Sequence, residues 1–265
     1  MRNLCDCPPA TLCAIDHVFT DIDDTLTTNG RLTAAAYSAM EALQNAGMTV
    51  IPITGRPAGW CDLIARQWPV SAVVGENGAF YFRHDDERRQ MSRQYFHSSA
   101  ERRQEEARLA VIRDLILTTV PGAALSADQA YREADLAIDF CEDVPPLSRE
   151  AIQQIVEIFE HHGAIAKISS IHVNGWFGNY DKLSMTRRLM LDQFAVDITE
   201  DNDRCLFAGD SPNDAPMFGF FNNSIGVANV MDQIELCAQP PKWVSKARAG
   251  AGFVELAQAL LDART

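Results

Sequence analysis

Short apolar segments alternate with amphipathic segments along the first third of the chain, and this alternation limits the possible folds more than any other feature. The predicted strands are 14–20, 48–54 and 72–74, and the predicted helices between them are 32–46 and 58–67. The strand at 48–54 is apolar almost throughout, as expected for a strand that is covered on both faces. Strands and helices in this order predict a parallel sheet with right-handed crossovers.

The alternation stops after residue 81 and returns near residue 181. The returning elements are a helix from 181, strands at 204–210 and 224–228, and a helix at 252–261. Between the two parts lie an arginine-rich passage at 83–93, a helix that begins with the capping box Ser98-Ser99-Ala100-Glu101, a strand at 136–140, a helix at 148–162, and one or two strands within 166–174. The sequence therefore predicts an α/β, doubly wound parallel-sheet core of the Rossmann-like type, formed by 1–81 and 180–265, with an inserted α+β cap at 82–179.

The charge balance excludes several classes of partner. The chain has 36 acidic and 23 basic side chains and a formal net charge of −13. A chain this acidic repels phosphate backbones and anionic lipid heads, so we expect no nucleic-acid partner and no membrane. No apolar run approaches the ~20 residues that cross a bilayer, and no secretion signal is recognised, so a cytoplasmic location is expected. Monomer and homodimer both remain open.

Cysteine usage agrees with that location. Seven cysteines is an odd number in a chain too large to need disulfides, so we interpret them as reduced thiols. Cys5, Cys7 and Cys13 could hold a soft metal, but a fourth ligand at a suitable spacing is missing. An ordinary leader segment is the favoured interpretation of this region.

Polar side chains follow three of the predicted strands. Because the carboxyl ends of parallel strands meet at one edge of a sheet, these groups should lie together. They are Asp21 and Asp23 after the first strand, Thr54, Gly55 and Arg56 after the second, and Asp210, Ser211, Asn213 and Asp214 after a later one. Four carboxylates can share a site only with a neutralising cation, and hard oxygen ligands favour Mg2+.

Lys182 adds a positive charge in an unusual place. It begins a predicted helix, where the helix dipole disfavours a cation by about 0.3–1 kcal/mol. An anion bound at that helix end would reverse the penalty. Taken singly, the pair Asp21 and Asp23 fits a turn with a helix cap, Thr54 fits a cap, and Lys182 fits a solvated surface residue. Their joint order at strand ends and helix starts predicts a phosphate site.

Four segments, in this order, resemble the motifs of the haloacid dehalogenase-like superfamily of phosphohydrolases. They are Val18–Leu26, Ile53–Arg56, Asp181-Lys182 and Gly209–Asp214. The insert and Gly75–Gly78 resemble subclass IIB, whose α+β cap lies over the site and which includes Cof-type sugar phosphatases, sucrose-phosphate phosphatases and phosphomannomutase. The resemblance covers the whole core but only the architecture of the cap. One departure is Asp24, where the family commonly has glycine; a solvated or capping role is expected for it.

The resemblance implies a role for each matched residue. Asp21 would attack phosphorus and form an aspartyl-phosphate, and Asp23 would protonate the leaving oxygen and then activate water. Thr54, Gly55 and nearby amides would hold the phosphoryl oxygens, with Lys182 balancing the charge. The implied Mg2+ ligands are Asp21, Asp23 through its carbonyl, Asp210, and Asp214 directly or through water, while Asn213 and Ser211 would contact phosphate or orient the ligands. Arg56 is either a substrate contact or a structural ion pair.

The cap is expected to select the substrate. His172, Asn174 or Trp176 would contact the leaving group, although Trp176 also fits a simple contact between cap and core. The predicted function is hydrolysis of a small soluble phosphate monoester of the sugar phosphate or phosphoglycolate and phosphoglycerate type by a Mg2+-dependent phosphatase. The alternatives are a phosphomutase of the phosphomannomutase type and, in a different class, a phospho-acceptor signalling domain.

Overall fold

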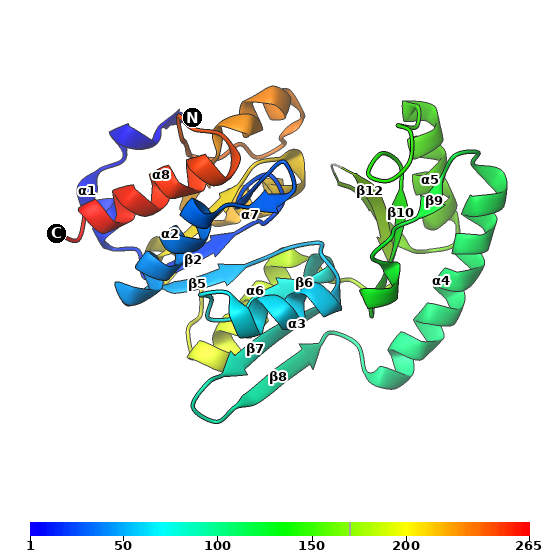
Figure 1. Cartoon of the computed structure of the whole chain (residues 1–265), viewed down its shortest axis with the longest axis horizontal. Helices are drawn as coiled ribbons and strands as arrows, with labels where there is room; N and C mark the ends of the chain where they lie inside the picture. Colours follow the sequence, from blue (N-terminus) through cyan, green and yellow to red (C-terminus); the bar gives the residue numbers. More distant parts are fainter. Residues whose placement is uncertain (170) are drawn as a thin grey trace.

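A six-stranded parallel sheet forms the centre of the computed structural model, which describes residues 1–169 and 171–265 (Figure 1). Every neighbouring pair in the sheet is parallel, and the strand order is β1-β15-β14-β13-β2-β5. The strands are β1 (Arg2–Asn3), β2 (His17–Thr20), β5 (Thr49–Pro52), β13 (Cys205–Gly209), β14 (Asn223–Gly226) and β15 (Trp243–Val244). This order confirms the predicted α/β fold.

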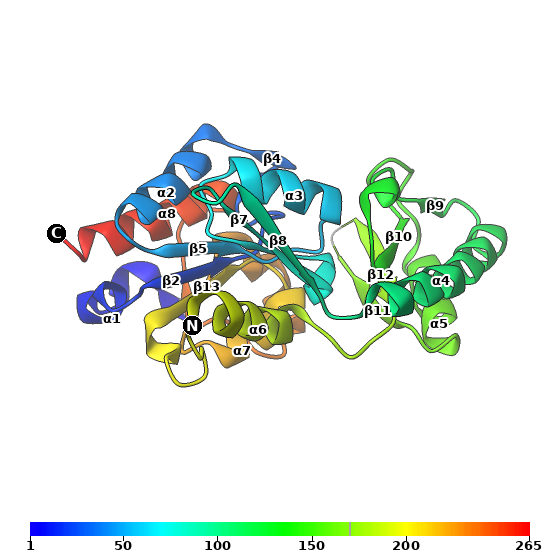
Figure 2. The same cartoon turned by 90° about the horizontal axis from the view of Figure 1, so that it is seen from below.

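Helices cover both faces of this sheet, as Figure 2 shows. On one face lie α2 (Ala34–Asn45), α3 (Ala58–Gln67) and α8 (Ala249–Asp262), and on the other lie α6 (Lys182–Phe194) and α7 (Ala215–Phe220); the short α1 (Pro9–Cys13) contacts α8. Because successive side chains of a strand point to opposite faces, Val18 of β2 packs in the core cluster with α2 and α8, and Phe19 packs in the cluster with α6. Burial on both faces explains why these strands are apolar throughout.

A second, antiparallel sheet extends the core beyond β5. It consists of β6 (Val73–Gly75), β7 (Phe80–Asp85) and β8 (Gln90–Tyr95), while β3 (Thr27–Thr28) and β4 (Arg31–Leu32) form a separate hairpin. The sequence predicted no strands in the arginine-rich passage, because β8 leaves most of its polar side chains exposed. Phe80 and Phe82 nevertheless pack in the core cluster. We therefore propose that the cap begins after Tyr95 and not at residue 82.

The inserted unit is a four-stranded antiparallel sheet with two helices on one face. Its elements are α4 (Ser99–Thr119), β9 (Ala124–Leu125), β10 (Asp135–Asp139), α5 (Arg149–His161), β11 (Ile165–Ile168) and β12 (His172–Trp176), in the sheet order β11-β12-β10-β9. Ile112 and Ile116 of α4 and Phe159 of α5 pack on Val173 of β12. The predicted capping box is present, since the Ser98 hydroxyl accepts from the Glu101 amide. The other face of the sheet is turned toward the core (Figure 1).

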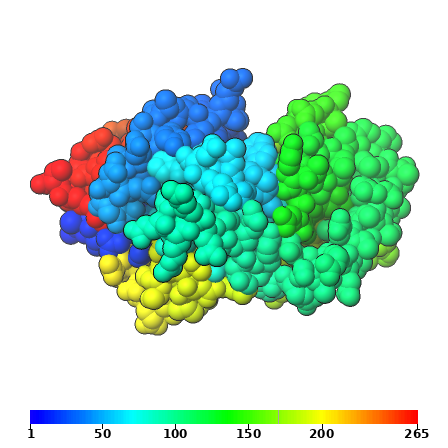
Figure 3. Space-filling model, turned by 60° about the horizontal axis from the view of Figure 1, so that its bottom comes forward, coloured from blue at the N-terminus to red at the C-terminus, as the bar shows by residue number. Residues whose placement is uncertain are grey.

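Short 3-10 helices complete the chain, and the one in the cap contacts the core. They are η1 (Leu4–Asp6), η2 (Glu76–Gly78), η3 (Gln129–Tyr131), η4 (Asn202–Arg204), η5 (Pro212–Asp214) and η6 (Ala228–Leu236). Figure 3 shows the green cap against the cyan part of the core, and η3 of the cap contacts α3. No helix among the described residues is both long and apolar enough to cross a membrane.

One buried carboxylate joins the two units. Glu76 is fully buried, and its side chain accepts hydrogen bonds from the backbone N–H of Ala58 in the core (2.9 Å) and of Glu133 (3.0 Å), Ala134 (2.6 Å) and Asp135 (3.1 Å) in the cap. Burial raises the pKa of Glu76 to about 8, and Arg132 and the N–H donors oppose that rise. The cap is therefore fixed over the strand ends by hydrogen bonds that require no cap side chain.

Candidate active site

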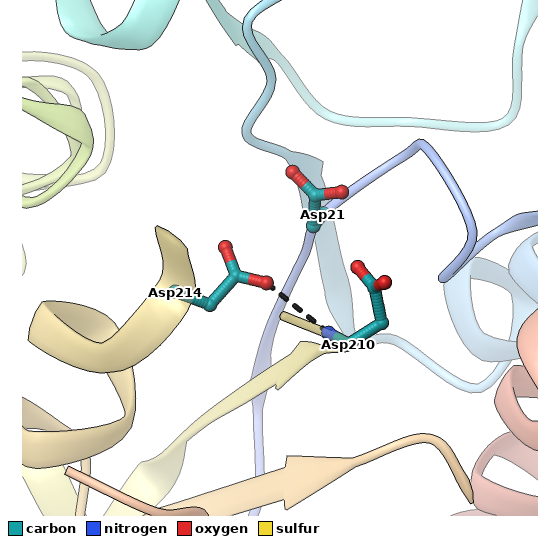
Figure 4. Close-up of side chains that lie close together, drawn as sticks. All are labelled: Asp21, Asp210 and Asp214. Carbon is teal, nitrogen blue, oxygen red and sulfur yellow. Dashed lines mark hydrogen bonds between the residues drawn. The ribbon is translucent and has the colours of Figure 1, made fainter. Parts of the chain in front are cut away.

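Three aspartates meet at the carboxyl ends of β2 and β13 (Figure 4). Asp21 follows β2, Asp210 follows β13, and Asp214 closes η5; one carboxylate oxygen from each lies within 4.8 Å of the others. The Asp210 amide donates to Oδ2 of Asp214 (3.1 Å). A Cβ on Gly209 would lie 2.4 Å from the same oxygen, so a glycine at this position leaves room for the Asp214 carboxylate. Of the four carboxylates predicted to gather, these three meet, whereas the side chain of Asp23 pairs with Arg56.

Lys182 neutralises part of this charge. Its Nζ donates to Oδ1 of Asp21 (2.6 Å) and to Oδ1 of Asp214 (3.0 Å). It is the first residue of α6, and Asp181 caps that helix by accepting from the Ser184 amide. Gly78 lies so close to this helix start that a Cβ there would sit 2.1 Å from the Asp181 carbonyl oxygen. The Gly75-Glu76-Asn77-Gly78 turn therefore contributes to placing Lys182.

The donor set suits a small divalent cation. Three hard carboxylate oxygens with one lysine leave an excess of negative charge in a buried site, and oxygen ligands of this kind are those Mg2+ takes. Burial, together with the neighbouring carboxylates, raises the pKa of Asp21 to about 7 and that of Asp210 to about 9. Protons therefore occupy these oxygens more readily when no cation is bound.

The second strand-end segment lies beside this cluster. Arg56 donates through Nε and Nη2 to the carboxylate of Asp23, at 3.0 and 2.8 Å. It also lies 3.8 Å from Asp128 and from Glu142 of the cap. Arg56 therefore forms the structural ion pair that was one of its two predicted roles. Thr54 is fully buried, and its hydroxyl accepts from the Arg56 amide (3.0 Å). Its contact with a phosphoryl oxygen stays a prediction.

A cleft of about 810 Å³ opens between this cluster and the cap sheet. Of the predicted site residues, its walls include Asp21, Asp23, Gly55, Arg56, His172, Asn174, Lys182, Asp210 and Asn213. In the cap wall, Asn174 donates to Oδ2 of Asp135 (3.0 Å), and Nε2 of His172 lies 2.9 Å from Glu142. Burial and Arg132 lower the pKa of His172. Trp176 instead stacks on Tyr180 in the core cluster, which is the simple contact between cap and core.

A family model described as haloacid dehalogenase-like hydrolase matches residues 18–114, a stretch that contains Asp21, Asp23, Thr54 and Arg56. Over this stretch the chain is similar to the haloacid dehalogenase-like hydrolases. This confirms the resemblance drawn from the motifs. No protein among the curated sequences matches the chain significantly.

Solved structures share the fold of this hydrolase over core and cap together. The Thermoplasma acidophilum protein 0175 has a TM-score of 0.70 and 19% identity, over 93% of this chain and 98% of its own. A putative HAD/COF-like hydrolase from Plasmodium vivax has a TM-score of 0.68 and 16% identity, over 96% and 98%. The sucrose-phosphatase of Synechocystis sp. PCC6803, solved with sucrose and phosphate, has a TM-score of 0.63 and 14% identity, over 92% and 97%.

Two residues that the sequence analysis missed hold Asp210 of the hydrolase in place. The Thr25 hydroxyl donates to Oδ1 of Asp210 (3.1 Å), and Nδ2 of Asn229 donates to Oδ2 (3.1 Å). Asn229 also donates to the Asp24 carbonyl (2.9 Å) and accepts from the Ala249 amide (2.9 Å) at the start of α8. Thr25 was part of the quoted motif, but Asn229 follows β14 in a segment whose sequence indicates only a strand end.

Asp24 is half-buried in the wall of the cleft. Its expected solvated or capping role stays a prediction. Its φ is +56°, a left-handed conformation that glycine adopts without cost and that aspartate tolerates better than most residues. This conformation gives a physical reason for the glycine that the family commonly has at this place.

The stability of the metal-free hydrolase should fall as pH rises. An unfolded aspartate has a pKa of about 3.9, whereas the pKa of Asp21 is raised to about 7 and that of Asp210 to about 9. Between these values the folded state binds more protons than the unfolded state, so its stability decreases with rising pH. Mg2+ must displace the same protons, and its affinity should rise up to about tenfold per pH unit for each proton displaced. Calorimetric titration with Mg2+ between about pH 5 and pH 9 measures this, and a pH-independent affinity would contradict it.

Removal of the Asn229 amide should weaken metal binding. Asn229→Ala leaves Asp210 held by Thr25 alone, and loss of such an orienting partner costs about 10–100-fold in metal affinity. Asn222→Ala is the matched control, because Asn222 is exposed and its side chain donates to Asp203 away from the cluster. Titration with Mg2+ measures both variants; equal affinities for Asn229→Ala and Asn222→Ala would show that Asn229 does not orient the ligands.

Proposed function

We propose that this hydrolase is a Mg2+-dependent phosphatase that cleaves small soluble phosphate monoesters through an aspartyl-phosphate on Asp21. The observation that carries the proposal is the contact of Lys182 with both Asp21 and Asp214, beside Asp210, at the bottom of a cleft large enough for a small ester. This arrangement combines a nucleophile, a fixed cation and a set of oxygen ligands within one buried cluster.

We assign one residue of the chain to each step of the hydrolysis. An oxygen of Asp21 would attack phosphorus as the ester oxygen departs with a proton from Asp23, which also lines the cleft. Asp23 would then take a proton from water, whose oxygen attacks phosphorus, releasing phosphate and restoring Asp21. Asp21, Asp210 and Asp214, with the Asp23 carbonyl, would hold the Mg2+, which when bound offsets negative charge on the phosphoryl group. Lys182 would contribute a second positive charge to the same oxygens.

The fold neighbours support the ester class in the proposal. The Synechocystis sucrose-phosphatase was solved with sucrose and phosphate, and another neighbour, at 16% identity and a TM-score of 0.61, is described as related to trehalose-6-phosphate phosphatase. For this chain we propose a small phosphate monoester of the sugar phosphate or phosphoglycerate kind. The substrate reaches the cluster through the cleft, whose other wall is the cap.

Phosphate release from a panel of such esters, with Mg2+ and with a chelator, tests this function. We expect release that depends on Mg2+, and mass spectrometry of acid-quenched protein should find a phosphoryl group on Asp21. Isomerised sugar phosphate without free phosphate would instead identify a mutase. An ester that is hydrolysed equally fast without divalent cations would refute the proposed role of Mg2+.

A further inference from the structure

The cleft offers little positive charge for binding an anionic group of a substrate other than its phosphoryl group. Lys182 pairs with Asp21 and Asp214, and Arg56 with Asp23. Arg132 lies between Asp128 and Asp135, each 2.9 Å away, and Arg248 pairs with Asp232. Lys167 is the one remaining cation in the cleft wall without an ion pair among the described residues, and it is exposed on β11. A second anionic group on a substrate would therefore meet one exposed, screened cation.

Uncharged polar groups occupy much of the remaining wall. The amides and hydroxyls of Thr28, Asn29, Asn77, Ser169, Asn213 and Gln233 line the cleft. Such groups donate and accept hydrogen bonds without net charge, so they suit a hydroxylated leaving group.

Asp24 adds a fixed negative charge to this wall. Its amide donates to the Thr27 hydroxyl (3.1 Å) and its carbonyl accepts from Asn229 (2.9 Å), so the main chain is held from both sides. Its side chain lines the same cleft as Asp21, three residues away. A leaving group must point away from the attacking Asp21 oxygen, which places it in the cleft whose wall includes Asp24.

We infer that Asp24 selects the leaving group by charge, favouring uncharged hydroxylated esters over esters that carry a carboxylate. This inference rests on the proposed phosphatase function and narrows its substrate class to sugar and polyol phosphates. For unit charges about 8 Å apart at an effective dielectric constant of about 20–40, the expected discrimination is about five- to thirtyfold.

The test uses two phosphate esters that differ in a single group of the leaving alcohol, which is uncharged in one ester and negatively charged in the other. Glycerol 3-phosphate and 3-phosphoglycerate have the same carbon skeleton, with a hydroxymethyl group in one and a carboxylate in the other. Their dissociation constants would be measured by calorimetry with Mg2+ in Asp21→Asn protein, so that no turnover interferes, with and without Asp24→Asn. Asparagine keeps the size of the side chain and tolerates the left-handed backbone; Asp24→Gly is the second variant should Asp24→Asn fold poorly. Glu160→Gln, an equal charge change at an exposed position of α5, is the matched control.

With Asp24 present, glycerol 3-phosphate should bind about five- to thirtyfold more tightly than 3-phosphoglycerate. Asp24→Asn or Asp24→Gly should reduce that ratio to about one by tightening binding of 3-phosphoglycerate, and Glu160→Gln should leave the ratio unchanged. A ratio that does not change on removal of Asp24, stronger binding of 3-phosphoglycerate with Asp24 present, or no binding of glycerol 3-phosphate overturns the inference. If the ratio behaves as expected but the wild-type protein releases phosphate from no ester, the proposed function fails and the charge selection by Asp24 stands.

Discussion

Asp21→Asn should abolish phosphate release, lowering kcat by about 10³-fold or more. The carboxamide oxygen is a poor nucleophile, so no aspartyl-phosphate can form, while the size of the side chain is unchanged. The contact of Lys182 with this position should persist in part, because an amide oxygen still accepts a hydrogen bond. Steady-state phosphate release from the best ester of the panel measures the effect.

Stability separates a chemical effect of Asp21→Asn from a structural one. The substitution removes one charge from a buried acidic cluster, so the thermal midpoint of the metal-free protein should not fall. Glu160→Gln is again the control, because it makes the same change in charge, and it should keep the wild-type rate. Full activity of Asp21→Asn would rule out Asp21 as the nucleophile, and Asp210 or Asp214 would then need to be examined.

Glu76→Ala should lower the free energy of unfolding by about 3 kcal/mol or more. The wild-type carboxylate accepts from four backbone N–H groups in the core and cap. Buried donors left without a partner cost about 1–3 kcal/mol each, offset in part if water enters the space. Denaturant unfolding measures the stability, and hydrogen exchange at Glu133, Ala134 and Asp135 should show that these cap amides lose protection.

Two further variants test whether the effect of Glu76→Ala comes from the hydrogen bonds. Glu76→Gln keeps the shape but turns an amide N–H2 toward some of the donors, so its loss of stability should be intermediate. Glu87→Ala, at an exposed position between β7 and β8, should change stability by less than about 0.5 kcal/mol. Wild-type protection at the three cap amides in Glu76→Ala would mean that the cap is fixed by other contacts.

The core elements could be predicted closely from the sequence because their burial follows local patterns. α3 spans Ala58–Gln67 as predicted, and α6 begins at Lys182 behind its Asp181 cap. The β7–β8 hairpin was missed because one of its strands keeps most of its polar side chains in solvent. Its position depends on Phe80 and Phe82 packing against the core, which is a tertiary contact that periodicity does not contain.

The candidate site was predicted where chemistry and strand ends coincide, and missed where it depends on contacts between distant segments. Asp21, Asp210 and Lys182 could be assigned from their positions after strands or at a helix start. Glu76 could not, because Gly75-Glu76-Asn77-Gly78 has the composition of a turn, and nothing local indicates that its carboxylate accepts amides far along the chain. Asn229 was missed for the same reason.

The place of β13 in the middle of the sheet determines when the cluster of Asp21, Asp210 and Asp214 can form as the chain is synthesised. β13 pairs with β2 on one side and β14 on the other, although the cap and α6 separate β2 from β13 in the chain. A nascent chain that has completed its cap still has Asp21 without Asp210 or Asp214, and β2 still has an open edge. Chains truncated before Cys205 should therefore bind no Mg2+ at Asp21, which calorimetry can check. The ability to bind Mg2+ would arise only when the last quarter of the protein has been synthesised.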